Sequence, residues 1–133
     1  MRARAIISCA IAAGLALAGA AAQAGTDYEA KLAELLEGRV AGAPVDCIPH
    51  DSHGAGSLTI VDRTAVIYRR GDTIYVNRTA NPKNLDWNDV LVVERFSGSR
   101  LCRQDRIFTH DRGGFGRTGV VFLERFVPYK KAG

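Results

Sequence analysis

Alternating β-branched and aromatic residues near the middle of the chain predict a β-hairpin. Two such runs cover residues 65–68 and 73–76, and Gly71-Asp72 between them suits a two-residue turn because glycine accepts a positive φ. The register this turn predicts is Arg70 with Thr73, Arg69 with Ile74, Tyr68 with Tyr75 and Ile67 with Val76. One face then presents Val66, Tyr68, Arg70, Thr73, Tyr75 and Asn77, and the other presents Ile67, Arg69, Ile74 and Val76.

Further apolar runs, separated by turn residues, predict more strands. They cover residues 57–63, 90–96, 105–109 and 120–127, with a flexible loop at 113–119. The run at 90–96 is almost continuously apolar, which favours a central strand buried on both faces. Pro128 is expected to end the last strand. The pattern predicts a mainly β fold, a small antiparallel barrel or sandwich of five to six short strands.

One amphipathic helix is predicted ahead of the strands. Residues 26–29 have the S/T-x-x-E form of a capping box, in which two side chains satisfy backbone amides at a helix start. Apolar side chains follow at helical spacing, at Tyr28, Leu32, Leu35 and Leu36. Gly38 is a suitable end. We expect this helix to lie across the sheet.

The first residues form a different kind of segment. Arg2 and Arg4 precede an apolar run rich in alanine and leucine, which ends in Ala22-Gln23-Ala24. A basic start, an apolar centre and an A-x-A end are typical of a cleavable signal peptide, although the run is long enough for a membrane anchor to be considered. Cleavage after Ala24 predicts a periplasmic or secreted protein with no membrane span. The domains are then 1–24 (signal peptide), 25–45 (helix and linker) and 46–131 (one β-rich domain).

Charge argues against nucleic acid as a partner. The full chain has a formal net charge of +4, and Arg2 and Arg4 contribute two of those charges. The remaining chain has no basic run beyond Arg69-Arg70 and Lys130-Lys131, so solvated surface charge explains these residues.

Cysteine use points to a disulfide. Cys9 leaves with the signal peptide, and Cys47 and Cys102 remain in an oxidising compartment, where such a pair favours a bond. Closing this loop would stabilise the fold by about 4 kcal/mol in the loop-entropy model. The alternative is a pair of reactive or metal-binding thiols.

Histidines near Cys47 make a metal site one alternative. Cys47-x-x-His50-x-x-His53, with His110 elsewhere in the chain, contains ligands suited to zinc or copper. A disulfide would remove the Cys47 thiolate, and histidines in a turn are often simply solvated. We therefore predict no metal and no cofactor, and keep metal binding through His50 and His53 as an alternative.

No motif supports catalysis. Gly114-x-Gly116-x-x-Gly119 matches the dinucleotide fingerprint, but the residues after it favour a strand where that motif requires a helix. Asp51, Ser52 and His53 are adjacent in sequence, and adjacent side chains rarely converge on one reacting atom. Arg70-Gly71-Asp72 is explained by turn chemistry. We predict that the protein is not an enzyme.

An aromatic surface is the candidate ligand site. Its residues are Tyr68, Arg70, Tyr75 and Trp87, the residue types that glycan and peptide sites use. The alternative is structural, with the tyrosines packing against each other across the hairpin and Trp87 covering one end of a barrel.

The order of short motifs resembles a known family. The motifs are Cys47-Ile48-Pro49, Ile60-Val61-Asp62, Ile67-Tyr68-Arg69, Tyr75-Val76-Asn77-Arg78, Leu101-Cys102-Arg103-x-Asp105 and Phe126-Val127-Pro128-Tyr129. They are similar to those of a family of small exported proteobacterial domains with no assigned function, over about residues 46–131. Members often have two further cysteines, where this chain has 82–84 and 121–122. Loss of both implies loss of one whole bridge, with Cys47 and Cys102 as the other.

The expected function is therefore a binding or structural role in the cell envelope. The partner would be an envelope protein or a small ligand, and the family resemblance implies no catalytic residues. A first alternative is an inhibitor of an envelope-directed hydrolase such as lysozyme, with residues 111–119 entering the enzyme cleft. The second alternative is the metal-binding protein that uses His50 and His53.

Overall fold

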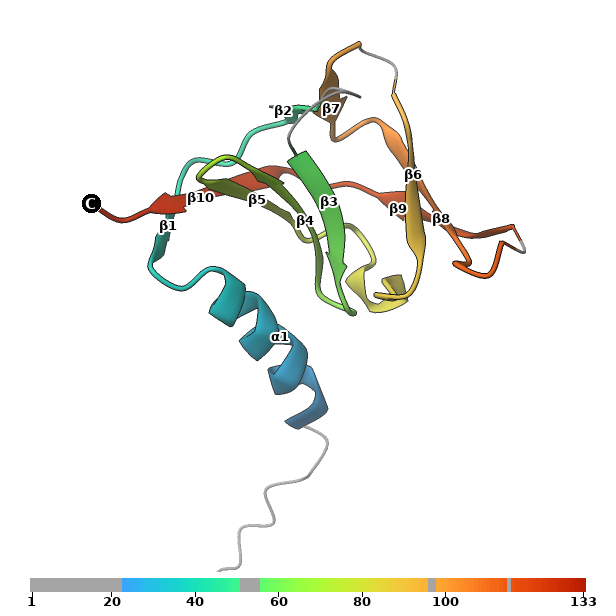
Figure 1. Ribbon diagram of the computed structural model, residues 1–133, viewed down its shortest axis with the longest axis horizontal. Helices are drawn as coiled ribbons and strands as arrows, with labels where there is room; N and C mark the ends of the chain where they lie inside the picture. Colours follow the sequence, from blue (N-terminus) through green and yellow to red (C-terminus); the bar gives the residue numbers. More distant parts are fainter. Residues whose placement is uncertain (1–22, 51–55, 96–97, 115) are drawn as a thin grey trace, which may run out of the picture.

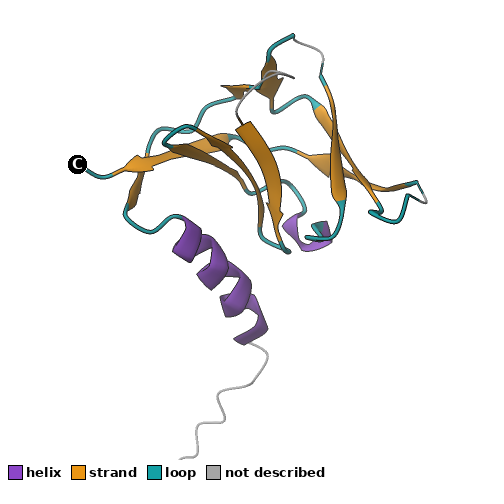
Figure 2. Ribbon diagram, in the orientation of Figure 1, coloured by secondary structure: helices purple, strands orange, loops and turns teal. Residues whose placement is uncertain are grey.

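The structure is a computed structural model that describes residues 23–50, 56–95, 98–114 and 116–133. It is mainly β, and the described residues form ten strands, one α-helix and one 3-10 turn (Figure 2). Their bounds are α1 Gln23–Leu35, β1 Arg39–Ala41, β2 Cys47–Pro49, β3 Gly56–Val61, β4 Ala65–Arg70, β5 Thr73–Asn77, η2 Pro82–Asn84, β6 Val90–Glu94, β7 Arg100–Cys102, β8 Arg106–His110, β9 Arg117–Phe122 and β10 Phe126–Lys131.

Three antiparallel sheets make up the fold. Their strand orders are β1-β10-β5-β4-β3, β2-β7 and β6-β8-β9. The predicted mainly β, antiparallel class with one N-terminal helix is confirmed. The sheets are not closed into a barrel, and ten strands replace the five or six expected. Strands of three residues, such as β1, β2 and β7, are too short to show an alternating pattern in the sequence.

The predicted hairpin is confirmed in position and register. Strands β4 and β5 pair through Arg70 with Thr73, Arg69 with Ile74, Tyr68 with Tyr75 and Ile67 with Val76. Gly71 has φ +56°, in the region that favours glycine. The turn alone therefore determines the pairing at the centre of the larger sheet.

Both faces of the five-stranded sheet are covered. Helix α1 lies across one face, where Leu32 is buried against the sheet (Figure 1). The buried side chains on this face are Leu32, Val61, Ala65, Ile67, Ile74 and Val76. The opposite face contributes to a second core, which it shares with the three-stranded sheet. That core contains Ile48, Val66, Tyr68, Leu85, Leu101, Ile107, Val121, Leu123 and Phe126.

The helix begins at Gln23, before the predicted capping box and inside the predicted cleavage motif. The predicted signal segment up to residue 22 lies outside the described residues. Leu32, Leu35 and Leu36 pack toward the sheet as their spacing predicts. No helix in the described part of the chain is long and apolar enough to span a membrane.

The prediction that residues 90–96 form a central, doubly buried strand is wrong. Strand β6 is an edge of the three-stranded sheet, and its burial alternates along the strand. Leu91 and Val93 pack against the core, whereas Val92 is 42% exposed. The central strand of this sheet is β8, which the sequence predicts only as a short strand at 105–109.

Pro128 does not end a strand, contrary to the prediction. It lies inside β10, and the apolar run before it is divided between β9 and β10. The Gly42 N–H donates to the Pro128 carbonyl oxygen (2.7 Å), so the peptide groups of Pro128 point toward β1 and away from β5. Strand β1 ends at Ala41, so the missing proline N–H leaves no gap in its ladder.

The predicted disulfide is present. Cys47 and Cys102 lie directly opposite each other in β2 and β7 and are bonded. This two-stranded sheet lies beside the other two (Figure 1). The bond joins segments 55 residues apart in sequence, one that follows β1 and one that leads into β8.

Candidate functional site

The predicted aromatic surface is divided by the fold. Tyr68 is buried in the core, and its ring stacks on that of Tyr75 with centroids 6.3 Å apart. Arg70 is exposed at the end of β4. Trp87 lies in the connection to β6 and is 66% exposed. The tyrosines therefore pack as the structural alternative predicts, whereas Trp87 does not cover the end of a barrel.

Trp87 borders a hollow of its own. Its backbone N–H donates to the Asp62 carboxylate (3.2 Å), which holds the connection beside the end of β3. The hollow has a volume of about 450 Å³, and its lining includes Lys31, Ile60 and Arg112. No ring contact joins Trp87 to Tyr68 or Tyr75 among the described residues.

The histidine cluster is not assembled in the described residues. Cys47 is in the disulfide, and the His50 ring packs against Tyr68 with centroids 5.1 Å apart. His53 lies outside the described residues. In the part of the chain that the structure describes, no group of three or more His, Cys, Asp or Glu side chains is arranged to hold a metal ion.

Two polar residues of the short sequence motifs, Asn77 and Asp105, have structural hydrogen bonds. The fully buried Asn77 side chain donates to the Glu124 carbonyl oxygen (2.8 Å) and accepts from the Glu124 N–H (2.9 Å) and the Thr79 N–H (3.0 Å). The buried Asp105 carboxylate accepts the Cys102 N–H at 2.7 Å in the turn between β7 and β8. These motifs therefore specify connections between strands.

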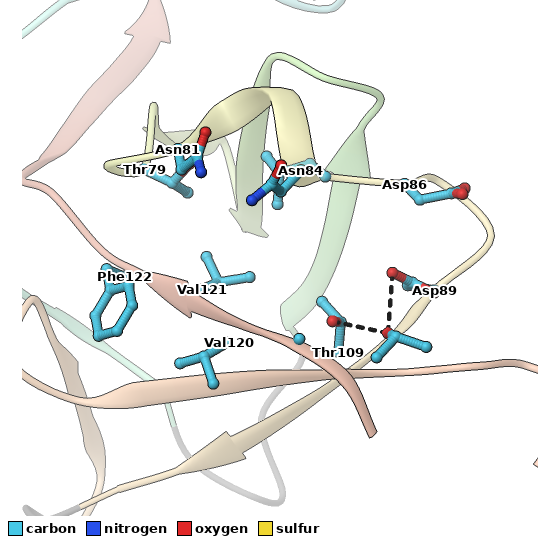
Figure 3. A pocket seen from close by; sticks show the side chains of 12 residues that line it. Thr79, Asn81, Asn84, Asp86, Asp89, Thr109, Val120, Val121 and Phe122 are labelled. Atoms are coloured by element: carbon cyan, nitrogen blue, oxygen red, sulfur yellow. Dashed lines mark hydrogen bonds between the residues drawn. The ribbon is translucent and has the colours of Figure 1, made fainter. Parts of the chain in front are cut away.

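A polar cleft lies between β9 and the connection from β5 to β6. We call it the β9 cleft. It has a volume of about 420 Å³, within the usual range for ligand sites. It is lined by Thr79, Asn81, Asn84, Leu85, Asp86, Asp89, Thr109, Thr118, Gly119, Val120, Val121 and Phe122. Figure 3 shows the asparagines and aspartates of the connection on one side and β9 on the other.

One wall of the cleft is a free strand edge. In the described sheet, β8 is the only strand hydrogen-bonded to β9. The Ala80 N–H donates to the Phe122 carbonyl oxygen (2.8 Å), so the peptide groups of Phe122 point away from β8. Peptide groups alternate in direction along a strand, so the N–H and C=O of Val120 point the same way, into the cleft.

Thr79 lines the cleft and has an unpaired side chain and an unusual backbone conformation. Its side chain is 5% exposed, and its hydroxyl oxygen has no hydrogen-bond partner among the described residues. Its φ of +57° is rare for a β-branched residue. The hydrogen bond from its N–H to the Asn77 side chain holds this conformation. A buried hydroxyl without a partner costs free energy.

Carboxylates make one end of the cleft acidic. Partial burial raises the pKa of Asp89 above its usual range, and the nearby charges of Asp86 and Asp111 raise it further. The Thr118 hydroxyl opposes this by donating to Asp89 (3.4 Å), and it also bonds to the Thr109 hydroxyl (2.9 Å). An arriving cation would relieve the repulsion between these carboxylates.

The lining is suited to binding. Its described residues offer amides, hydroxyls, carboxylates and a strand edge, which can hold a ligand through hydrogen bonds.

Comparison with known proteins gives no relative. No family model, curated protein or solved structure matches the chain.

The β9 cleft was missed in the sequence because it is built by tertiary packing. Residues 79–89 and 118–122 are both polar or β-prone segments with no shared motif. From the sequence, the Asn and Asp residues of segment 81–89 predict only turns. Only the path of the connection beside β9 brings the two segments together.

Proposed function

We propose that the protein is an exported, non-catalytic binding domain that takes its ligand in the β9 cleft. The observation that carries this proposal is the free edge of β9, which faces a polar cleft. A free strand edge presents unpaired N–H and C=O groups, and natural proteins usually cover or pair them. A ligand bound in this cleft would pair the edge.

Export is the second part of the proposal. It is supported by the sequence of residues 1–24 and by the Cys47–Cys102 disulfide, which suits an oxidising compartment. The protein would work in the periplasm or outside the cell, as a member of the family of small exported domains it resembles. Fusion of the chain to alkaline phosphatase tests this, since the enzyme is active only after export. Equal activity with and without residues 1–24 would reject export.

Binding is tested by mapping any ligand on the chain. The probes are arrays of peptides, glycans and envelope polysaccharide, followed by NMR titration of the best hit. We expect amide shifts in residues 79–89 and 118–122. Asn84→Trp should fill the cleft and abolish binding, whereas Lys83→Trp, an exposed neighbour outside the lining, should retain it. Binding that Asn84→Trp leaves unchanged would reject the cleft as the site.

A second candidate function is inhibition of an envelope-directed hydrolase. One observation favours it: the end of β8 and the start of β9 point away from the rest of the molecule (Figure 1). The Asp111 carboxylate accepts the Gly113 N–H (3.0 Å), which orders the residues that follow β8, and Arg112 beside it is exposed. Assays against a panel of lysozymes test this function. Full enzyme activity at high protein concentration would reject it.

A further inference from the structure

We infer that the ligand of the β9 cleft is an extended polypeptide segment that joins the three-stranded sheet as a fourth strand beside β9. This inference rests on the proposed binding function and adds the chemical class of the ligand. Strand addition to a sheet edge is a general mode of peptide recognition, in which backbone hydrogen bonds give affinity and side-chain contacts give specificity.

The backbone of β9 supplies the first part of the argument. Val120 directs one donor and one acceptor into the cleft, and an extended peptide needs this pair opposite it. The bond from Ala80 to the Phe122 carbonyl already resembles the first rung of such a ladder. A peptide would continue this ladder along β9 toward Thr118.

Apolar side chains on the outer face of β9 supply the second part. Val120 is 41% exposed and Phe122 is 64% exposed, and both lie on the face of the sheet that no other element covers among the described residues. A residue paired with Val120 would place its own side chain on this face. A β-branched or aromatic residue there would bury apolar surface of the strand.

Charge supplies the third part. Side chains of a strand alternate between faces, so the residues next to the one opposite Val120 point toward the interior of the cleft. Asp86 and Asp89 lie there, and Gly119 adds no side chain to fill the space. The fitting ligand has an apolar residue next to a lysine or arginine. The second wall offers the exposed amides of Asn81 and Asn84 to the free edge of the peptide.

A saccharide accounts for fewer of these features. The asparagines, aspartates and threonines of the cleft suit hydroxyl groups equally well. A saccharide, however, has no regular backbone to match the Val120 donor and acceptor, and it does not explain the exposed apolar strip beside them. The geometry therefore favours a peptide.

The test begins with the selection of binders from a random decapeptide display library. The target is the protein from residue 25 to residue 133. We expect selected peptides to share a β-branched or aromatic residue next to a basic one. Synthetic versions with one N-methylated peptide bond at each position then test strand pairing. Methylation should weaken binding about tenfold or more at alternate positions and have little effect at those between, because only alternate N–H groups face β9. Uniform effects of methylation would overturn strand addition.

Variants of the protein test the same pairing from the other side. Val120→Pro removes the edge N–H, whereas Val120→Thr keeps it together with a β-branched shape. We expect loss of peptide binding in the first variant and retention in the second, with thermal unfolding as a check that each is folded. Saccharide binding in the cleft, with no peptide selected, would overturn this inference but leave the proposed function intact. Absence of any ligand that shifts the cleft residues would overturn both.

Discussion

The two larger sheets of this protein differ in how much of their surface is covered. The five-stranded sheet has helix α1 on one face and the shared core on the other, so residues 65–68 of β4 are all buried. The three-stranded sheet contributes only one face to the core, and its outer face exposes Val90, Val92, Val120 and Phe122. The comparison shows that one part of the molecule is organised for stability and the other leaves apolar surface available for contact.

The two sheets differ in how much of their surface is covered by other elements, and not in their amino-acid composition. Strands β4 and β6 are both rich in β-branched residues, yet β4 is interior and β6 is an edge. The described residues contain one α-helix, and that helix lies on the five-stranded sheet. The three-stranded sheet therefore relies on its inner face, on the disulfide beside it and on side chains such as Arg117, which lies over the Phe108 ring at 3.5 Å.

The largest expected effect on stability comes from removing the disulfide that joins the two regions. Replacing Cys47 and Cys102 together with alanine should lower the free energy of unfolding by about 4 kcal/mol, because the bond closes a long loop in the unfolded chain. Denaturant titration measures this. Amide hydrogen exchange should also accelerate in β7 and β8 more than in β4. An unfolding midpoint unchanged by the double substitution would contradict this account.

Core truncation tests the comparison directly. Ile67→Ala in the five-stranded sheet should cost about 3 kcal/mol, since Ile67 is buried under the helix. Val92→Ala on the open face of the other sheet should cost less than about 1 kcal/mol, because its side chain is already partly in water. Denaturant titration of the two variants provides the matched pair. Equal losses of stability would show that the outer face is covered in solution.

A smaller effect is expected at the connection from β9 to β10. Asn77→Ala should cost about 2 kcal/mol, because it leaves the Glu124 N–H and carbonyl without their side-chain partner. Asn88→Ala, at an exposed turn position, is the control and should be nearly neutral. Thermal unfolding measures both. A neutral Asn77→Ala would mean that the connection between the two sheets is held by packing alone.

The smallest effect concerns the acidic end of the β9 cleft. The pKa of Asp89 is raised in the folded state, so its contribution to stability is complete below its ordinary value of 3.8 and is lost as pH rises through the folded value. Asp89→Asn should therefore be more stable than the natural chain at pH 7, by less than about 1 kcal/mol at this partly exposed site. Denaturant titrations from pH 3 to pH 7 measure the difference. Asp72→Asn, on an exposed turn, is the control, and a gain that does not grow with pH would contradict the assignment.

The sequence predicts features that depend on neighbouring residues. The hairpin register follows from Gly71-Asp72, and the helix stripe follows from the spacing of its leucines. Prediction from the sequence fails where a structure depends on residues far away in the chain. Whether an apolar run becomes β4 or β6 depends on where the helix packs, and Pro128 fits inside β10 only because β1 ends beside it.

The same reason explains the candidate sites. Tyr68, Tyr75 and Trp87 are conspicuous in the sequence, but register directs Tyr68 into the core. The β9 cleft is made of small polar residues and backbone groups, and residue type does not distinguish a free strand edge from a paired one. Such a site becomes visible only when the strand order is known.

Strand β10 comes latest in the chain but lies inside the five-stranded sheet, between β1 and β5. A polypeptide that emerges from a ribosome or crosses a membrane N-terminus first delivers every other strand of this sheet before residues 126–131. During that interval β1 has no strand to pair with, and β5 has an open side. The sheet is therefore completed when β10 inserts between β1 and β5. This pairing joins distant parts of the chain, so it is slow compared with hairpin formation. This order of assembly delays stable folding until the whole sheet has been delivered.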